Sequence, residues 1–168
     1  AFNDEAIPPK LFEKLPARLP RGKYYFTGLY KFEKYYQPHH YHDMFAAGFR
    51  SLYIGLESAN ERIQRHMQKN NTQDVMLSNL ADAHAAGIWN HTFNFFGFPT
   101  ETREEAMETA NFLIDHADII HSEGTGTFSF EHNAPISKHP ERFGVTKVIE
   151  KQGSVLEIYS DYETQSGL

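Results

Sequence analysis

Polar residues that can bind charged or hydrogen-bonding groups stand where several apolar segments of the sequence end. Ligands of parallel α/β folds lie beyond the carboxyl ends of the strands. We therefore expect these residues to share one rim of a parallel sheet: Asn3, Asp4, Glu5, Glu57, Ser58, Gly97, Pro99, His132 and Asn133. The alternative is helix capping, in which Ser58, Thr100 and Thr102 only satisfy free backbone amides.

The segment around Gly97 has the residue types of a site for a flat ligand. Gly97 permits a close approach to the backbone, and Pro99 fixes the turn that follows. Phe95 and Phe98 have the shape to flank a planar ring, although packing in the core is the simpler explanation for either one.

Strand-like and helix-like segments alternate along the chain. The expected strands are 23–30, 49–56, 88–98 and 125–131, and the expected helices are 10–19, 38–47, 60–69, 72–86 and 102–118. The connections are long enough for right-handed parallel crossovers. This pattern predicts an α/β fold with mainly parallel strands, either an open doubly wound sheet or part of a β/α barrel.

Finer expectations concern helix faces and the end of the chain. One helix should bury Met76, Leu80 and Ala83, and the next should bury Ala106, Ala110, Leu113 and Ala117. A last strand is expected over 155–159, and an irregular tail over 163–168.

Composition excludes several classes of protein. The chain has no cysteine, which rules out disulfides and thiolate metal sites within it. The net charge of −6 argues against a nucleic-acid scaffold, and no apolar run approaches the roughly 20 residues of a membrane span. We expect a cytoplasmic protein, and the start at Ala1 suggests a piece of a longer one.

An ordered set of short motifs resembles the radical S-adenosylmethionine (SAM) superfamily, in particular Fe–S oxidoreductases related to cobalamin-dependent members and methylthiotransferases. The resemblance covers about residues 2–145 and is most specific in Ile-Gly-Leu-Glu-Ser (54–58) and Gly-Phe-Pro-Thr-Glu-Thr (97–102). The other motifs are Phe-Asn-Asp-Glu-Ala-Ile-Pro (2–8), Ala-Gly-Phe-Arg (47–50), Met-Gln-Lys (67–69), Ala-Gly-Ile (86–88) and Ala-Pro-Ile (134–136).

The resemblance implies a partial TIM-type (β/α) barrel over residues 1–145, from its second strand onward, and a partly irregular C-terminal extension over 146–168. In this family a 4Fe–4S cluster on a C-x-x-x-C-x-x-C loop reductively cleaves SAM, and the resulting deoxyadenosyl radical abstracts hydrogen from a substrate. By position, Asn3-Asp4-Glu5 matches the segment that contacts the methionine amino group. Glu57 and Ser58 match the segment near the ribose and carboxylate, Phe95 to Pro99 match the adenine segment, and His132-Asn133 stand at the next strand end.

The sequence departs from the family pattern in three places. The cluster cysteines are missing, Asn3-Asp4 replaces Gly-Gly, and Phe93 and Thr100 stand where the adenine motif has Gly and Glu. The simplest account is truncation, with the cysteine loop upstream of Ala1. The full-length parent is then the enzyme, and this chain alone is expected to be inactive and to hold neither cluster nor SAM stably.

Two other classes stay open. The ten histidines, including His39, His40 and His42, suggest a His/Asp/Glu metal-dependent hydrolase, although H-E-x-x-H spacing is missing. A non-catalytic assembly domain is the other alternative, in which exposed sheet edges pair to give a homodimer. No nucleophile elbow or phosphate-binding P-loop is present.

The lack of cysteine gives a direct test. After reconstitution with iron and sulfide, the purified chain should stay colourless, because it has no thiolate to hold a cluster. A stable brown protein with a cluster signal in electron paramagnetic resonance would contradict this expectation.

Overall fold

A computed structural model describes residues 9–20, 22–132, 134–149 and 158–165. Its elements follow one another as α1 (Pro9–Lys14), β1 (Phe26–Tyr30), α2 (Pro38–Ala47), β2 (Phe49–Glu57), α3 (Glu61–His66), α4 (Gln73–Ala85), β3 (Trp89–Phe96), α5 (Arg103–Asp115), β4 (Ser122–Thr127), β5 (Phe130–Glu131), α6 (Pro135–Lys138), the 3₁₀ helix η1 (Pro140–Phe143), β6 (Val145–Ile149) and β7 (Tyr159–Thr164).

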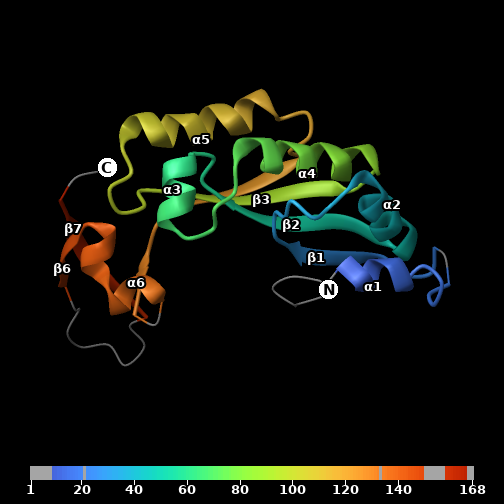
Figure 1. Ribbon diagram of the computed structural model, residues 1–168, viewed down its shortest axis with the longest axis horizontal. Helices are drawn as coiled ribbons and strands as arrows, with labels where there is room; N and C mark the ends of the chain where they lie inside the picture. The colour runs from blue at the N-terminus through green and yellow to red at the C-terminus, as the bar shows by residue number, and fades with distance from the viewer. Residues whose placement is uncertain (1–8, 21, 133, 150–157, 166–168) are drawn as a thin grey trace.

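The main layer is a four-stranded parallel sheet in the order β1-β2-β3-β4. Helices α2, α4 and α5 all lie over the same face of this sheet (Figure 1). A doubly wound sheet would carry helices on both faces, so the arrangement is that of an open arc of a β/α barrel. The prediction of an α/β fold with mainly parallel strands is confirmed. Strands β1 and β4 are the two edges of this sheet, and pairing of two chains through them stays a prediction.

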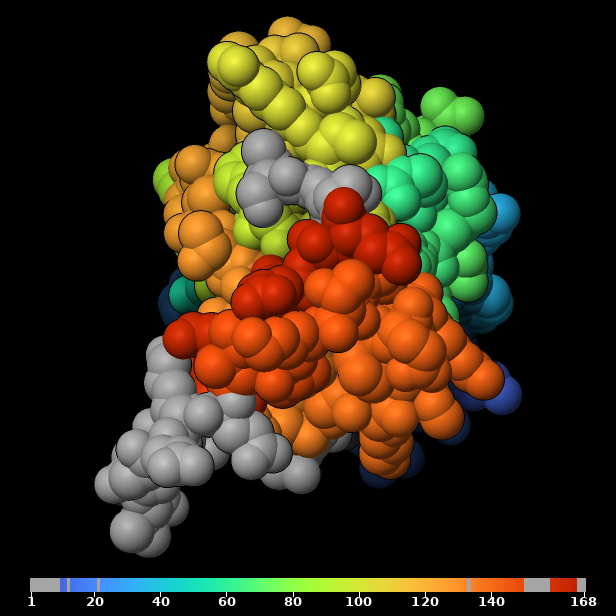
Figure 2. All heavy atoms as spheres, turned by 90° about the vertical axis from the view of Figure 1, so that its left-hand side faces the viewer, coloured from blue at the N-terminus to red at the C-terminus, as the bar shows by residue number. Residues whose placement is uncertain are grey.

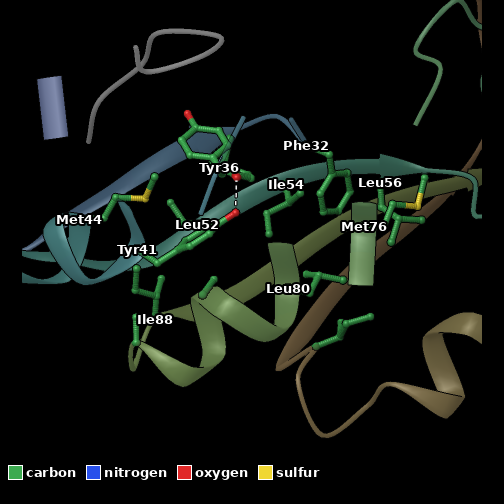
Figure 3. Close-up of a cluster of buried hydrophobic side chains, with 14 of the residues drawn as sticks. Phe32, Tyr36, Tyr41, Met44, Leu52, Ile54, Leu56, Met76, Leu80 and Ile88 are labelled. Atoms are coloured by element: carbon green, nitrogen blue, oxygen red, sulfur yellow. Dashed lines mark hydrogen bonds between the residues drawn. The ribbon is translucent and has the colours of Figure 1, made fainter. Parts of the chain in front are cut away.

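The core lies between this sheet and the helices (Figure 3). Leu52, Ile54 and Leu56 alternate along β2 toward the helices and are almost fully buried. From α4, Met76 and Leu80 meet them, and Ala83 of the same helix is also buried, as predicted from the helical period. The opposite face of the sheet, which we call the inner face, carries no helix among α2, α4 and α5.

Several element ends follow from local signals in the sequence. Helix α2 has the predicted bounds because Pro38 occupies its first turn and Gly48 ends it with a positive φ of 110°. Thr72 accepts a hydrogen bond from the amide of Val75 and so begins α4. Thr102 and Glu105 form the predicted capping box of α5.

The predicted buried stripe of α5 is only partly confirmed, because Leu113 packs against the core cluster but none of the four predicted residues is buried. Its buried residues are Thr109 and Phe112, whereas Ala106, Ala110 and Leu113 are only partly buried and Ala117, beyond the helix, is exposed. Polar contacts set this rotation of the helix, because the Thr109 hydroxyl accepts the amide hydrogen of Ala59 at 3.0 Å.

Other element boundaries also differ from the prediction. Strand β4 spans Ser122–Thr127 rather than 125–131, because its pairing with β3 outweighs the low strand propensity of its two glycines. Helices α1 and α3 are shorter than expected. Glu163 and Thr164 belong to β7 rather than to an irregular tail. Of the predicted strand over 155–159, residues 155–157 lie outside the described residues and Tyr159 begins β7.

The last elements form a small cap at the carboxyl end of the parallel strands. Strands β5, β7 and β6 make an antiparallel sheet in that order, which the sequence did not predict. Figure 2 shows these segments in orange and red across this end of the molecule, with α5 above them and α3 beside them. Phe130, Ile136 and Phe143 of the cap share a hydrophobic cluster with Ile63 and Phe98.

The turn after β3 is fastened to its surroundings by buried polar groups. The carboxylate of Glu101 accepts the Gly97 amide hydrogen at 2.6 Å, and the Gly97 carbonyl accepts the hydroxyl hydrogen of Tyr162 at 3.1 Å. Glu101 is fully buried, and its Oε1 has no hydrogen-bond partner among the described residues. Burial raises the pKa of the Glu101 carboxyl, opposed by the hydrogen bonds from the Gly97 and Phe98 amides.

A buried polar chain joins β1 to α2 and α4. The Tyr30 hydroxyl donates to Asn79 Oδ1 at 2.9 Å and lies 2.6 Å from the Tyr41 hydroxyl, which therefore donates to Tyr30. Asn79 Oδ1 also accepts the amide hydrogen of Glu33 at 3.2 Å. A single side chain thus satisfies two donors from the β1 side of the core.

Replacing Asn79 tests this chain. Asn79→Ala leaves the Tyr30 hydroxyl and the Glu33 amide without their acceptor, and an unsatisfied buried donor costs about 1–3 kcal/mol. We expect urea unfolding to give a loss of free energy of unfolding in that range. The control is Asn111→Ala on the exposed side of α5, which should change it by no more than about 0.5 kcal/mol. Equal effects of the two variants would contradict the role of Asn79.

Glu101 should make stability depend on pH. Because its pKa is higher in the folded than in the unfolded chain, it favours the folded state at low pH. This contribution is lost as the pH rises from the ordinary value of 4.5 through the raised one. Relative to Glu101→Gln, the free energy of unfolding of the wild type should therefore fall over this window in a urea series. The exposed Glu104→Gln variant keeps Glu101 and is the matched control, so the free energy of unfolding of the wild type relative to it should not fall over this window. A fall of the same size relative to Glu104→Gln would argue against Glu101 as the source.

Candidate functional site

Two adjoining hollows lie where the parallel strands end. The larger, of about 640 Å³, lies on the inner face of β1, β2 and β3, and we call it the inner hollow. The smaller, of about 250 Å³, lies between the sheet and the cap, and we call it the rim hollow. Glu57, Gln68 and Lys69 line both and form their common wall.

An ion pair stands at this wall. Lys69 Nζ lies 2.5 Å from Glu57 Oε1, and both side chains are partly exposed. The Glu57 carboxylate is folded back over Gly55, where a Cβ atom would lie 2.6 Å from Oε1. Gly55 therefore provides the space in which a carboxylate and an ammonium group meet on the inner face.

A bulge in β2 turns Glu57 to this position. Gly55 pairs with Phe93 and Glu57 with the next residue, Asn94, so β2 carries one extra residue here. Glu57 adopts a positive φ of 64°, which costs a non-glycine residue of order 1–3 kcal/mol.

The segment after the bulge is held by side chains. Gln64 of α3 donates to the carbonyls of Leu56 at 2.8 Å and of Ser58 at 2.6 Å. Ser58 is fully buried, and its hydroxyl lies 3.1 Å from the Thr109 hydroxyl of α5. Ser58 thus joins β2 to α5 and lines neither hollow.

The rim hollow is largely apolar, and four phenylalanines are among the residues that line it. Phe98 packs edge-on against Phe128 with centroids 5.0 Å apart, and Phe95 lies 5.7 Å from the same ring. Met67, Ile136 and Phe143 complete much of the lining. A wall of this kind suits the flat, apolar faces of a ring, while the Glu57–Lys69 pair provides charge at its edge.

The structure brings some of the sequence-predicted residues together. Glu57, Phe95 and Phe98 line the rim hollow, whereas Gly97 and Pro99 form the turn behind it. His132 lies in the cap, with its Nε2 2.8 Å from the Ser160 hydroxyl, and lines neither hollow. Asn3, Asp4, Glu5 and Asn133 lie outside the described residues. The binding roles of all these residues stay predictions.

Lys69 and Gln68 were missed as site residues. The sequence signal was weak, because a Lys in a polar segment after a short helix is typical of an exposed turn. Their place at the wall follows from the chain reversal after α3, in which Gln68 and Asn70 adopt positive φ values of 60° and 55°.

Among the described residues, no group of three or more His, Asp or Glu side chains is arranged to hold a metal ion. His40 is engaged in the start of α2, where its Nδ1 accepts the amide hydrogen of Gln37 at 2.9 Å. The hydrolase alternative therefore gains no support from His40. No described helix is long and apolar enough to cross a membrane.

Solved structures that share this fold include those of TsrM, HemN and OxsB. The radical SAM methyltransferase TsrM from Kitasatospora setae, with cobalamin and a 4Fe–4S cluster bound, gives a TM-score of 0.67 at 14% identity over 86% of this chain and 31% of its own. Coproporphyrinogen III oxidase (HemN) from Escherichia coli, a radical SAM enzyme, gives 0.57 at 14% identity over 84% and 38%. The cobalamin-dependent SAM radical enzyme OxsB gives 0.52 at 19% identity over 62% and 16%.

The chain thus spans less than two fifths of the length of each of these proteins. No curated protein matches the sequence. The model of the radical SAM superfamily, however, matches residues 24–113, which include β1 to β3, the turn after β3 and most of α5. This match extends over more than half of the chain, and it shows that the chain belongs to the radical SAM superfamily.

Proposed function

We propose that this chain is the SAM-binding part of an Fe–S oxidoreductase, with the methionine end of SAM at the Glu57–Lys69 pair and adenine in the rim hollow. The observation that carries the proposal is the position of this ion pair, at the wall between a largely apolar hollow and the open inner face. SAM needs the same combination, because a flat base and a charged amino acid group flank its sulfonium centre.

Each part of the site has a role that its chemistry suits. Lys69 offers an ammonium group to the methionine carboxylate, and Glu57 offers acceptors to the ribose hydroxyls or the amino group. Phe95 and Phe98 supply the faces for adenine. Glu101 and Tyr162 hold the turn at Gly97 in place, so they position the site without contacting its ligand.

The cluster that the family implies does not fit the residues of this chain. Thiolates hold such clusters, and the sequence has no cysteine. In the family the cluster supplies the electron that cleaves SAM to a deoxyadenosyl radical. We assign the cluster ligands to another part of the parent protein, and we assign to this chain the binding and orientation of SAM. Alone, it should bind SAM only weakly and leave it intact.

Lys69→Gln tests the site. Hydrogen bonds to a charged group contribute about 1.5–3 kcal/mol, so the variant should bind SAM at least about tenfold more weakly in calorimetric titration. Binding of 5′-methylthioadenosine, which has no carboxylate, should not change. Lys147→Gln is the matched control, because Lys147 forms a similar pair with Glu163 away from both hollows.

Two results would contradict the proposal. One is SAM affinity that Lys69→Gln leaves unchanged. The other is an equal loss for SAM and 5′-methylthioadenosine in a variant whose circular dichroism matches the wild type. Either result would show that Lys69 does not bind the methionine carboxylate.

A further inference from the structure

The proposed SAM site includes only the wall of the inner hollow and gives no role to the rest of it. Leu29 of β1 and Lys31 after it, Tyr53 and Gly55 of β2, and Phe93 of β3 line it. Its volume of about 640 Å³ lies within the range of small-molecule sites. Leu29 and Phe93 are 39% and 42% exposed, so large apolar side chains face open space directly beside the Glu57–Lys69 pair.

Glycines flank Phe93 on both neighbouring strands. Phe93 pairs with Gly55 of β2 and with Gly124 of β4. A Cβ atom at Gly124 would lie 3.1 Å from Cδ1 and 3.3 Å from Cε1 of Phe93, so the ring extends over the space that a side chain would need. Glycine within a strand weakens it and often marks a bulge, a tight bend, or a site where a ligand or another backbone comes close.

Two more rings extend this surface. Tyr53 lies nearly parallel to Phe93, with centroids 6.0 Å apart and planes at 21°. His91 stands edge-on to Phe93 at 4.7 Å, and its Nδ1 is 2.7 Å from the Ser122 hydroxyl, which fixes the ring. The inner face therefore presents Tyr53 and Phe93 as a platform for a flat group.

The charge in the hollow favours an anion. Two lysines and one carboxylate line it, and Lys69 is already paired with Glu57. Lys31 lies 3.3 Å from Glu33, but both of these side chains are about half exposed. Such a pair contributes only about 0–1 kcal/mol, so an anionic ligand can replace Glu33 at low cost.

We propose that the inner hollow binds the substrate, and that this substrate carries a planar aromatic ring, on Tyr53 and Phe93, and an anionic group, near Lys31. This inference rests on the proposed function, because it places the substrate beside SAM. The competing occupant is a layer of apolar side chains from the rest of a barrel, which would fill the hollow with no ligand.

Three small probes test ring and charge separately by calorimetric or NMR titration. Indole-3-acetate has both features, cyclohexylacetate lacks the aromatic ring and indole-3-acetamide lacks the charge. We expect indole-3-acetate to bind most tightly. Phe93→Leu should weaken it about three- to tenfold, in line with the contribution of an aromatic pair. Lys31→Gln should weaken indole-3-acetate without changing indole-3-acetamide.

A glycine pair supplies the matched control. Gly124→Ala should weaken indole-3-acetate, because the new methyl group displaces the Phe93 ring. Gly126→Ala, two residues along β4, should not, because a Cβ there has no atom within 4 Å. Circular dichroism of both variants checks that they fold.

The outcomes separate this proposal from the previous one. Phe93→Leu should keep the SAM affinity of the wild type, and Lys69→Gln should weaken SAM while leaving the uncharged indole-3-acetamide unchanged. Equal affinities for indole-3-acetate and cyclohexylacetate, or no effect of Phe93→Leu, would overturn the proposal and favour a packed barrel interior. If the chain does not bind SAM, but Phe93→Leu and loss of the aromatic ring still weaken probe binding as expected, only the proposed SAM site would be overturned.

Discussion

The way the chain leaves β2 is the constraint on which the candidate site depends. Gln64 donates to two carbonyls, one on each side of Glu57, and so holds a residue that would otherwise favour a different backbone conformation. Each neutral hydrogen bond contributes about 0.5–1.5 kcal/mol, which is the order of the conformational cost at Glu57. Because of the bulge, the carboxylate lies over Gly55 and within reach of Lys69. Without the bulge, the regular alternation of side chains along β2 would point the Glu57 side chain in a different direction.

Polar contacts extend this constraint to the neighbouring elements. The hydroxyls of Ser58 and Thr109 join the β2 exit to α5. Arg62 of α3 pairs with Glu105 and donates to the Thr100 carbonyl at 2.8 Å, so it ties α3 to the turn after β3. Burial makes the contact between Ser58 and Thr109 specific, because water could not replace a lost partner there. Helices α3 and α5 and the turn therefore keep fixed positions around the rim.

Two different surfaces border the rim, one formed by the cap and one by the inner face of the parallel sheet. The cap closes the rim hollow with aromatic side chains and anchors the Gly97 carbonyl through Tyr162. No helix among α2, α4 and α5 covers the inner face, and its glycines leave Phe93 lying across β4. One ion pair borders both surfaces, which is why a cosubstrate in one hollow and a substrate in the other would meet at Glu57 and Lys69.

By itself, the sequence determined the local elements and the class of fold. The ends of α2 followed from Pro38 and Gly48, and the start of α5 followed from Thr102 and Glu105, because proline, glycine and capping side chains act within a few residues. The apolar run of β2 and the lengths of the connections predicted a parallel sheet, and the ordered motifs predicted the superfamily. Only the tertiary structure decided which side chains meet. Lys69 reaches Glu57, Ser58 turns inward, and Thr109 rather than Ala110 faces the core. A bulge, a chain reversal and hydrogen bonds between distant elements set the directions of these side chains. None of these three features depends on neighbours in the sequence alone.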